Sequence, residues 1–274
     1  MNKISLIIPD LHHRWQDAEN IIESVNHDEV IFLGDYFDDF NDTPEMMEST
    51  CDWLNGSVKK SNRIHLFGNH DVHYAFPYRR WKCSGYEQWK DFITTDNIPR
   101  TVWDKLKWYH VLDNTWLLTH AGLHKFNVPE EIQALHTDRE KFFPALTNHL
   151  DISIQEGFQL AANNVPSWVF GAGRSRGGAN RVGGITWCDF DREFTPIKGL
   201  NQIFGHTPQT NGSAEWYLVN ELEKITYATG TDHKSDHKIL ADPNVSENLC
   251  LDVWKRTHYA VWDGKSLTIG AVKR

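Results

Sequence analysis

Short apolar runs alternate with amphipathic stretches over roughly the first seventy residues. Ile4–Ile8 and Val30–Leu33 are apolar throughout, and Trp15–Val25 between them repeats its apolar positions at helical spacing. This order predicts a parallel βαβ unit. A second helix, with Thr43 as its cap signal and a proline in its first turn, leads into a third run, Arg63–Phe67, which extends the parallel sheet by one strand.

The middle of the chain has a different pattern. Val72–Lys107 is rich in Trp, Tyr and Arg and indicates a helical or irregular insertion at about residues 72–110, which we expect to form a lid or wall over a site. Thr115–Leu118 restores a strand, and Pro129–Ala162 favours helix. The glycine- and arginine-rich stretch 171–184 predicts a surface loop, either an anion cradle or a flexible connection.

The last third is rich in predicted strands, with a hairpin signal at Asp263-Gly264. The predicted strands include Gln202–Phe204, Ile225–Ala228, Cys250–Val253, Tyr259–Trp262 and Leu267–Ala271.

Residues of the metal-binding types follow apolar segments at five places. These groups are Asp10-Leu11-His12, Gly34-Asp35, Gly68-Asn69-His70-Asp71, Thr119-His120-Ala121-Gly122 and Gly205-His206-Thr207. Because the carboxyl ends of parallel strands meet at one edge of a sheet, we expect these side chains to converge. Asp10 and His12 are two residues apart, and strand alternation predicts that both point to one side. Mixed Asp, Asn and His ligands suit a paired divalent-metal site, in which one carboxylate bridges two cations.

Composition limits the remaining possibilities. The 274 residues, 40% of them hydrophobic, suit a single domain spanning residues 1–274. A formal charge of -9 argues against broad binding of nucleic acid or anionic lipid. No apolar run is long enough for a membrane helix and no cleavage signal follows Met1, so we predict a cytoplasmic protein without membrane association. The four cysteines are scattered, which predicts reduced, buried thiols rather than disulfides or a zinc site.

Taken together, the five groups resemble the motifs of the calcineurin-like metallophosphoesterase superfamily. They extend from Asp10 to Thr207, about three quarters of the chain. His120-Ala121-Gly122-Leu123 and Gly205-His206-Thr207-Pro208 are more similar to the phosphoprotein phosphatase and diadenosine tetraphosphatase branch, whereas other branches often carry a second histidine at the position of Pro208. The segment around Trp187 is similar to a Trp-x-Asp segment of protein phosphatases.

The resemblance implies a fold, a metal centre and a mechanism. The fold is α/β, a four-layer α-β-β-α sandwich. Two divalent metal ions are implied, manganese first, with iron or zinc as alternatives. The implied ligands are Asp10 and His12 for the first metal, Asp35 as the bridge, and Asn69, His120 and His206 for the second. His70, oriented by Asp38, is the implied general acid, and a hydroxide bridging the metals attacks phosphorus in line.

One departure from the family pattern concerns phosphate binding. Phosphoprotein phosphatases usually place Arg-Gly after the second aspartate of the Gly-Asp block, where this chain has Asp39 and Phe40. An acidic Asp39 facing the substrate would disfavour a dianionic monoester. Other cations could replace the missing arginine: Arg14, Arg79, Arg80, Arg174, Arg176 or Arg181. His13 and Asp71 also depart from the usual residues, but neither change removes a metal ligand.

These features predict a phosphatase that acts on a phosphorylated small molecule, a nucleotide or a phosphoprotein. A phosphodiesterase acting on cyclic nucleotides or nucleic-acid ends is an alternative. A non-catalytic scaffold, with the aromatic-rich segment Tyr74–Trp108 as its interface, is another, although the complete ligand set with His70 favours an enzyme.

Two further residue types are expected to be structural. His233 and His237 could bind a metal, but their polar surroundings favour a solvated loop. Tryptophans such as Trp116 are expected in the core rather than stacked on bases.

Overall fold

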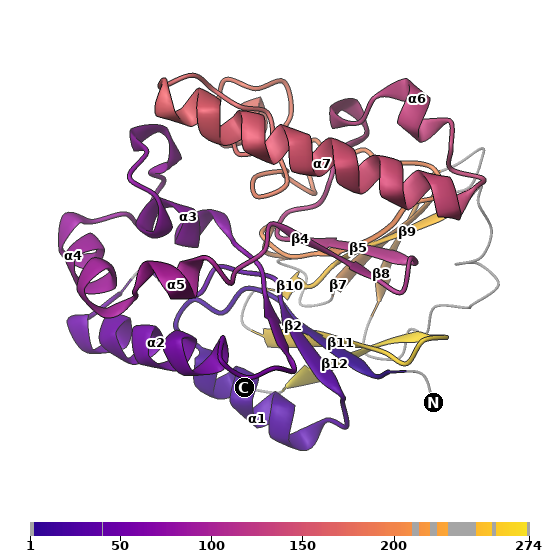
Figure 1. The fold of residues 1–274 in the computed structure, drawn as a ribbon. Coiled ribbons are helices and arrows are strands. Elements are labelled where there is room, and N and C mark those ends of the chain that lie inside the picture. Colours follow the sequence, from indigo (N-terminus) through magenta and orange to yellow (C-terminus); the bar gives the residue numbers. More distant parts are fainter. Residues whose placement is uncertain are drawn as a thin grey trace.

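Helices enclose two stacked sheets in the computed structural model of the chain (Figure 1). The structure describes residues 3–39, 41–209, 214–219, 224–229, 245–253 and 256–272. Helices α1 (Trp15–Ser24) and α2 (Pro44–Ser57) cover one side, and the long helix α7 (Arg139–Ala162) covers the opposite side. The predicted four-layer α/β sandwich is confirmed.

The first sheet contains the predicted parallel strands. Its described order is β10-β11-β1-β2-β3, with β12 paired to β11. Strands β1 and β2 are parallel, as are β2 and β3, whereas β1 pairs with β11 in antiparallel orientation. The bounds are β1 Ser5–Ile8, β2 Glu29–Phe32, β3 Arg63–His65, β10 Asp252–Val253, β11 Arg256–Trp262 and β12 Leu267–Val272. The predicted hairpin at Asp263-Gly264 joins β11 to β12.

The second sheet has the described order β4-β5-β6-β9-β7-β8. Its central strands β5, β6 and β9 are parallel, and β4, β7 and β8 pair antiparallel at the edges. The bounds are β4 Tyr109–Leu112, β5 Trp116–Thr119, β6 Asn201–Phe204, β7 Ala214–Val219, β8 Lys224–Thr229 and β9 Ser246–Cys250. Ile7 and Ile31 of the first sheet share one buried cluster with Leu118, Ile203 and Leu249 of the second, so the sheets pack face to face.

The helices bury the faces that the sequence pattern predicts. Ala18 and Ile21 of α1 are buried, as are Met47 and Leu54 of α2. The hydroxyl of Thr43 accepts a hydrogen bond from the Met46 amide at 3.3 Å, which confirms the predicted cap. No described helix has the length and apolar character needed to cross a membrane.

Short helices form the segment between β3 and β4, as its pattern indicates. They are α3 Asn69–Ala75, the 3-10 turn η1 Arg79–Trp81, α4 Gln88–Asn97 and α5 Arg100–Trp103. Between β5 and β6 lie α6 Glu130–Gln133, α7, and a loop that contains the 3-10 turn η3 Arg174–Arg176. The glycine-rich stretch is therefore a loop, as predicted. That the whole chain forms one domain stays a prediction.

A buried histidine makes the stability of this fold sensitive to acid. His65 Nε2 lies 3.0 Å from the Ser57 hydroxyl, and His65 Nδ1 lies 3.1 Å from the Tyr36 hydroxyl. Burial, and next the charge of Arg63, lower the pKa of His65 to about 3. In the unfolded chain the pKa of a histidine is about 6.5. Between about pH 6.5 and pH 3, therefore, His65 is protonated in the unfolded chain but not in the folded protein.

We expect the His65 contribution to the free energy of unfolding to be complete above about pH 6.5 and to fall progressively towards pH 3. At about pH 4.5 the loss from this residue should be roughly 3 kcal/mol, since each unit below the unfolded pKa is worth about 1.4 kcal/mol. Urea unfolding of the wild type and of His65→Gln, followed from about pH 7.5 to 4.5, measures it. The variant should lose less stability over this range, and parallel losses would contradict the assignment.

Candidate active site

The predicted ligands meet at the carboxyl edge of the two sheets. Asp10 follows β1, Asp35 follows β2, and Asn69 opens α3 after β3. His120 and His206 follow β5 and β6 of the second sheet. The parallel strands of both sheets thus end at one place, which explains why residues almost two hundred positions apart, such as Asp10 and His206, are in contact.

Two groups of side chains could hold metal ions. One consists of Asp10, His12 and Asp35, and the other of Asp35, His120 and His206; in each group the ligand atoms lie within 4.8 Å of one another. Asp35 belongs to both groups. Asn69 adjoins the second group, with its Oδ1 3.0 Å from His120 Nε2. The structure therefore brings together all six predicted ligands, five of them buried and His12 partly exposed.

Hydrogen bonds to backbone carbonyls fix the protons of two of these histidines. His120 Nδ1 lies 3.0 Å from the Leu33 carbonyl, and His12 Nδ1 lies 3.0 Å from the Phe37 carbonyl. Because a carbonyl oxygen only accepts, each Nδ1 carries a proton, so Nε2 is the atom that each ring could offer to a metal ion. This arrangement orients imidazoles towards a metal.

The atoms around His120 Nε2 favour a positive charge at this position. Asn69 Oδ1 and Asp35 Oδ2 lie 3.0 and 3.3 Å away, and both are acceptors. Burial lowers the pKa of His120, but the carboxylates of Asp35 and Asp10 outweigh it and raise this pKa to about 9. His206 Nε2 is buried without a hydrogen-bond partner among the described residues. Positive charge is therefore strongly favoured at this point, and the donor set suits a divalent metal.

The backbone at the site adopts a conformation that is rare for residues other than glycine. The φ angles of His12, Asp35, Asp38 and His206 are 43°, 52°, 63° and 68°. Such left-handed conformations cost of order 1–3 kcal/mol each and cluster at functional sites. Strand alternation does not explain why Asp10 and His12 lie together, because β1 ends at Ile8 and a turn carries His12. That part of the prediction is wrong. The two side chains nevertheless belong to one group of potential ligands.

Two motif glycines allow the backbone to approach the ligand carboxylates closely. A Cβ atom at Gly68 would overlap the Asp35 carboxylate, and one at Gly205 would overlap the carboxylate of Asp10. These glycines are therefore required by the packing of the site.

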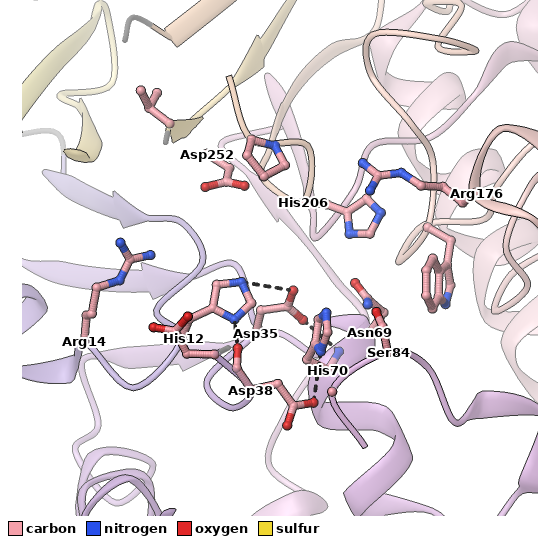
Figure 2. Close-up of a pocket in the computed structure, with 15 residues that line it drawn as sticks. His12, Arg14, Asp35, Asp38, Asn69, His70, Ser84, Arg176, His206 and Asp252 are labelled. Atoms are coloured by element: carbon pink, nitrogen blue, oxygen red, sulfur yellow. Dashed lines mark hydrogen bonds and ion pairs between the residues drawn. The ribbon is translucent and has the colours of Figure 1, made fainter. Parts of the chain in front are cut away.

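His70 and Asp38 form a hydrogen-bonded pair beside the ligand groups (Figure 2). His70 Nδ1 lies 2.9 Å from Asp38 Oδ2, and the Tyr74 hydroxyl donates to Asp38 Oδ1 at 2.7 Å. Burial would raise the pKa of Asp38, but His70 and His73 lower it below its ordinary range. Conversely, burial lowers the pKa of His70, and Asp35 and Asp38 raise it above its usual value. An ionised Asp38 thus holds the Nδ1 proton of His70 and leaves Nε2 towards the cavity.

A cavity of about 420 Å³ opens onto these residues. Arg14 and Arg176 both line it, and Figure 2 shows them on opposite sides of His12 and Asp35. Arg176 is held by Asp189, with Nε 2.7 Å from Oδ2, and by the hydroxyl of Thr207 at 3.2 Å.

Among the described side chains, Arg80, Arg174 and Arg181 do not line the cavity. Arg80 donates to the Asn164 carbonyl at 2.5 Å, Arg181 covers the Phe126 ring at 4.3 Å, and Arg174 is exposed. The side chain of Arg79, and the residues Phe40, His233 and His237, lie outside the described part of the structure.

The family model for calcineurin-like phosphoesterases matches residues 5–210, the part of the chain that carries the six candidate metal ligands, His70 and Asp38. The chain belongs to the calcineurin-like phosphoesterase family. This membership places it among phosphoester hydrolases.

Solved structures with a similar fold include a metallophosphoesterase from Sphaerobacter thermophilus, with 11% sequence identity, a TM-score of 0.50, and coverage of 100% of this chain and 89% of that chain. Another is a protein serine/threonine phosphatase from Saccharomyces cerevisiae with similarity to human phosphatase PP5, with 12% identity, a TM-score of 0.47, and coverage of 100% and 80%. The first likeness supports the fold alone. A comparison with curated protein sequences gave no match.

Some residues that contact the candidate site are not among those predicted from the sequence. His73 Nε2 lies 3.0 Å from Asp38 Oδ2, and its spacing of three from His70 on one helix was the available signal. Lys90 lies 3.2 Å from Asp38 Oδ1, and no local signal marks it. The expectation that all cysteines are buried is wrong for Cys83, which is only partly buried and lies 3.2 Å from His73 Nδ1. Asp252 lines the cavity from β10.

Proposed function

We propose that this chain is a dinuclear metal-dependent phosphoesterase of the phosphatase type. The observation that carries the proposal is the position of Asp35, which belongs to both groups of potential ligands and faces His120 Nε2 across 3.3 Å. Asp10, His12 and Asp35 would hold the first metal, and Asp35, Asn69, His120 and His206 the second. When bound, two divalent cations lower the pKa of a water molecule and neutralise charge on a phosphoryl group.

The residues of the chain supply binding and proton transfer. Arg14 and Arg176 line the cavity and can donate to phosphoryl oxygens, Arg176 with its guanidinium held by Asp189. His70 also lines the cavity, and its Nδ1–H donates to Asp38 Oδ2 at 2.9 Å. Its Nε2 is therefore the atom that protonates the departing alkoxide, as a general acid. The alkoxide leaves as the alcohol.

A second candidate function, phosphodiester hydrolysis, rests on Asp39. This residue lines the cavity at the position where phosphoprotein phosphatases usually carry a phosphate-binding arginine. A carboxylate there repels a dianionic monoester more than a monoanionic diester, such as a cyclic nucleotide or a nucleic-acid end. Phosphorylated small molecules, nucleotides and phosphoproteins remain the proposed substrate classes for the monoesterase.

The scaffold alternative has weaker support. A binding platform has no physical need for two converging ligand groups that hold left-handed backbone at His12, Asp35 and His206. Manganese is the proposed metal, with iron or zinc as alternatives, since mixed Asp, Asn and His shells suit all three. The cytoplasmic location stays a prediction.

Metal removal and replacement tests the proposed function. We expect hydrolysis of para-nitrophenyl phosphate to fall to background when metals are chelated, and to return with added manganese, iron or zinc. A bis-aryl phosphate assayed in parallel separates the two candidate activities: faster cleavage of the diester favours the phosphodiesterase, and faster cleavage of the monoester favours the phosphatase. Activity that survives chelation, with metal loss verified by elemental analysis, would refute metal dependence.

A further inference from the structure

Lys90 is a buried lysine that contacts Asp38, the hydrogen-bond partner of His70. Its side chain is only 3% exposed, and its ammonium lies 3.2 Å from Asp38 Oδ1. It comes from α4, fifty-two positions along the chain from Asp38. A lysine is rarely buried unless it is paired, so this contact needs a physical reason.

The ammonium also joins two other segments of the chain. It contacts the carboxylate of Asp42, whose side chain is 2% exposed, and it donates to the Gly85 carbonyl at 2.7 Å. Gly85 lines the cavity, and a Cβ atom there would press against Asp38. Lys90 therefore fastens the segment that carries Asp38 to the loop that forms one wall of the cavity.

The contacts of Asp38 show what Lys90 contributes. Oδ2 lies 2.9 Å from His70 Nδ1 and 3.0 Å from His73 Nε2. Oδ1 accepts from Tyr74 at 2.7 Å and from Lys90 at 3.2 Å. Both oxygens are thus held on two sides, so the carboxylate cannot rotate without losing a partner. Among the described lysines and arginines, Lys90 is the one that pairs with the Asp38 carboxylate.

Lys90 does not line the cavity, so it has no contact with a substrate there. Its influence on catalysis has to pass through Asp38 to the imidazole of His70. A proton donor must be held in a narrow range of positions, and partners that hold a catalytic side chain typically contribute about 10- to 100-fold.

We propose that Lys90 is a positioning residue for proton donation to the leaving group: it clamps Asp38 and the Gly85 wall so that His70 Nε2 faces the cavity. This inference rests on the proposed function and adds a residue from the segment between β3 and β4 to its machinery.

The experiment compares two phosphate monoesters that differ in their leaving groups. We expect Lys90→Met and Lys90→Gln to lower kcat about 10- to 100-fold for an alkyl phosphate. For para-nitrophenyl phosphate the loss should stay within about threefold, because a good leaving group needs little protonation. Lys90→Arg, which keeps the charge, should recover part of the alkyl-ester activity.

A double variant and a matched control separate positioning from stability. In a His70→Ala background, Lys90→Met should have little further effect on the alkyl ester, since both changes remove the same step. Arg63→Met is the control: Arg63 is equally buried, with a side chain 4% exposed, and pairs with Glu19 rather than with Asp38. It should lower thermal stability without changing the ratio of the two activities.

The outcomes distinguish this inference from the proposed function. If the wild type has no metal-dependent activity, the proposed function fails. If the wild type is active but the folded Lys90 variants lose equal activity on both esters, or their effect adds fully to that of His70→Ala, the positioning role fails alone. Should Lys90→Met not fold, the same comparison with Lys90→Gln and Lys90→Arg decides the matter.

Discussion

Asp35→Asn should reduce metal-dependent hydrolysis by at least roughly 10³-fold, equivalent to about 4 kcal/mol of transition-state stabilisation. Asp35 is shared by both groups of ligand atoms, and its side chain is 2% exposed. An amide has the same shape but no negative charge, so it cannot bridge two cations. The decisive measurement is hydrolysis of para-nitrophenyl phosphate in added manganese, with the bound metal counted by elemental analysis.

The substitution should change the chemistry of the site more than its fold. Asn is among the residues that best tolerate a positive φ, and Asp35 has a φ of 52°. As a matched control, Asp104→Asn makes the same chemical change at an exposed carboxylate that pairs with Arg100 on the surface. That variant should keep wild-type activity and metal content. Ordinary activity in Asp35→Asn would refute the dinuclear assignment.

The sequence predicts the parts of the fold that depend on local patterns. All residues of β1 and β2 are buried, at 0% exposure except for Glu29 at 5%, and Thr43 caps α2 as its position before a proline predicts. The metal-binding residue types could be located because they follow these strands and a sheet edge collects them. The spacing of apolar residues and the residues that begin and end helices are local properties of the sequence, so they can be recognised without a structure.

What the sequence could not predict depends on long-range packing. Lys90 reaches Asp38 from α4, and nothing around it distinguishes it from an ordinary surface lysine. The selection of Arg14 and Arg176 from the five candidate arginines whose side chains are described depends on how loops fold against the cavity. The turn at His12 replaces an expected strand, with a φ of 43° that the residue type alone does not indicate.

The distribution of charge explains how an acidic chain can serve an anionic substrate. The chain has a formal charge of -9, and Asp10, Asp35 and Asp38 are buried close to the cavity. Bound divalent cations would reverse the sign at that point, whereas Asp39 leaves a carboxylate on the cavity lining. Burial, and next the charge of Asp10, raise the pKa of Asp252 well above its ordinary value, which favours its neutral form. Substrate choice should therefore depend on whether Arg14 and Arg176 outweigh Asp39, which the comparison of monoester with diester measures.

His70→Ala should produce a loss that depends on the leaving group. For an alkyl phosphate, we expect kcat to fall by about 10²- to 10⁴-fold, the usual contribution of a general acid. His70 is placed for this role because Asp38 holds its Nδ1 at 2.9 Å and because the ring lines the cavity. An aryl phosphate with a nitro group should lose far less, since its phenolate departs without a proton.

The two substrates together distinguish acid catalysis from a general disturbance of the metal centre. His70 follows the proposed ligand Asn69, and its backbone amide donates to Asp35 at 2.9 Å, so damage to the ligands would slow both esters alike. The backbone bond survives in the alanine variant, which leaves the missing imidazole as the cause of a selective loss. His27→Ala, in the connection between α1 and β2 at the opposite edge of the sheet, should slow neither ester. Equal losses on the alkyl and the aryl ester in His70→Ala would remove His70 from the acid role and leave the proposed metal ligands untouched.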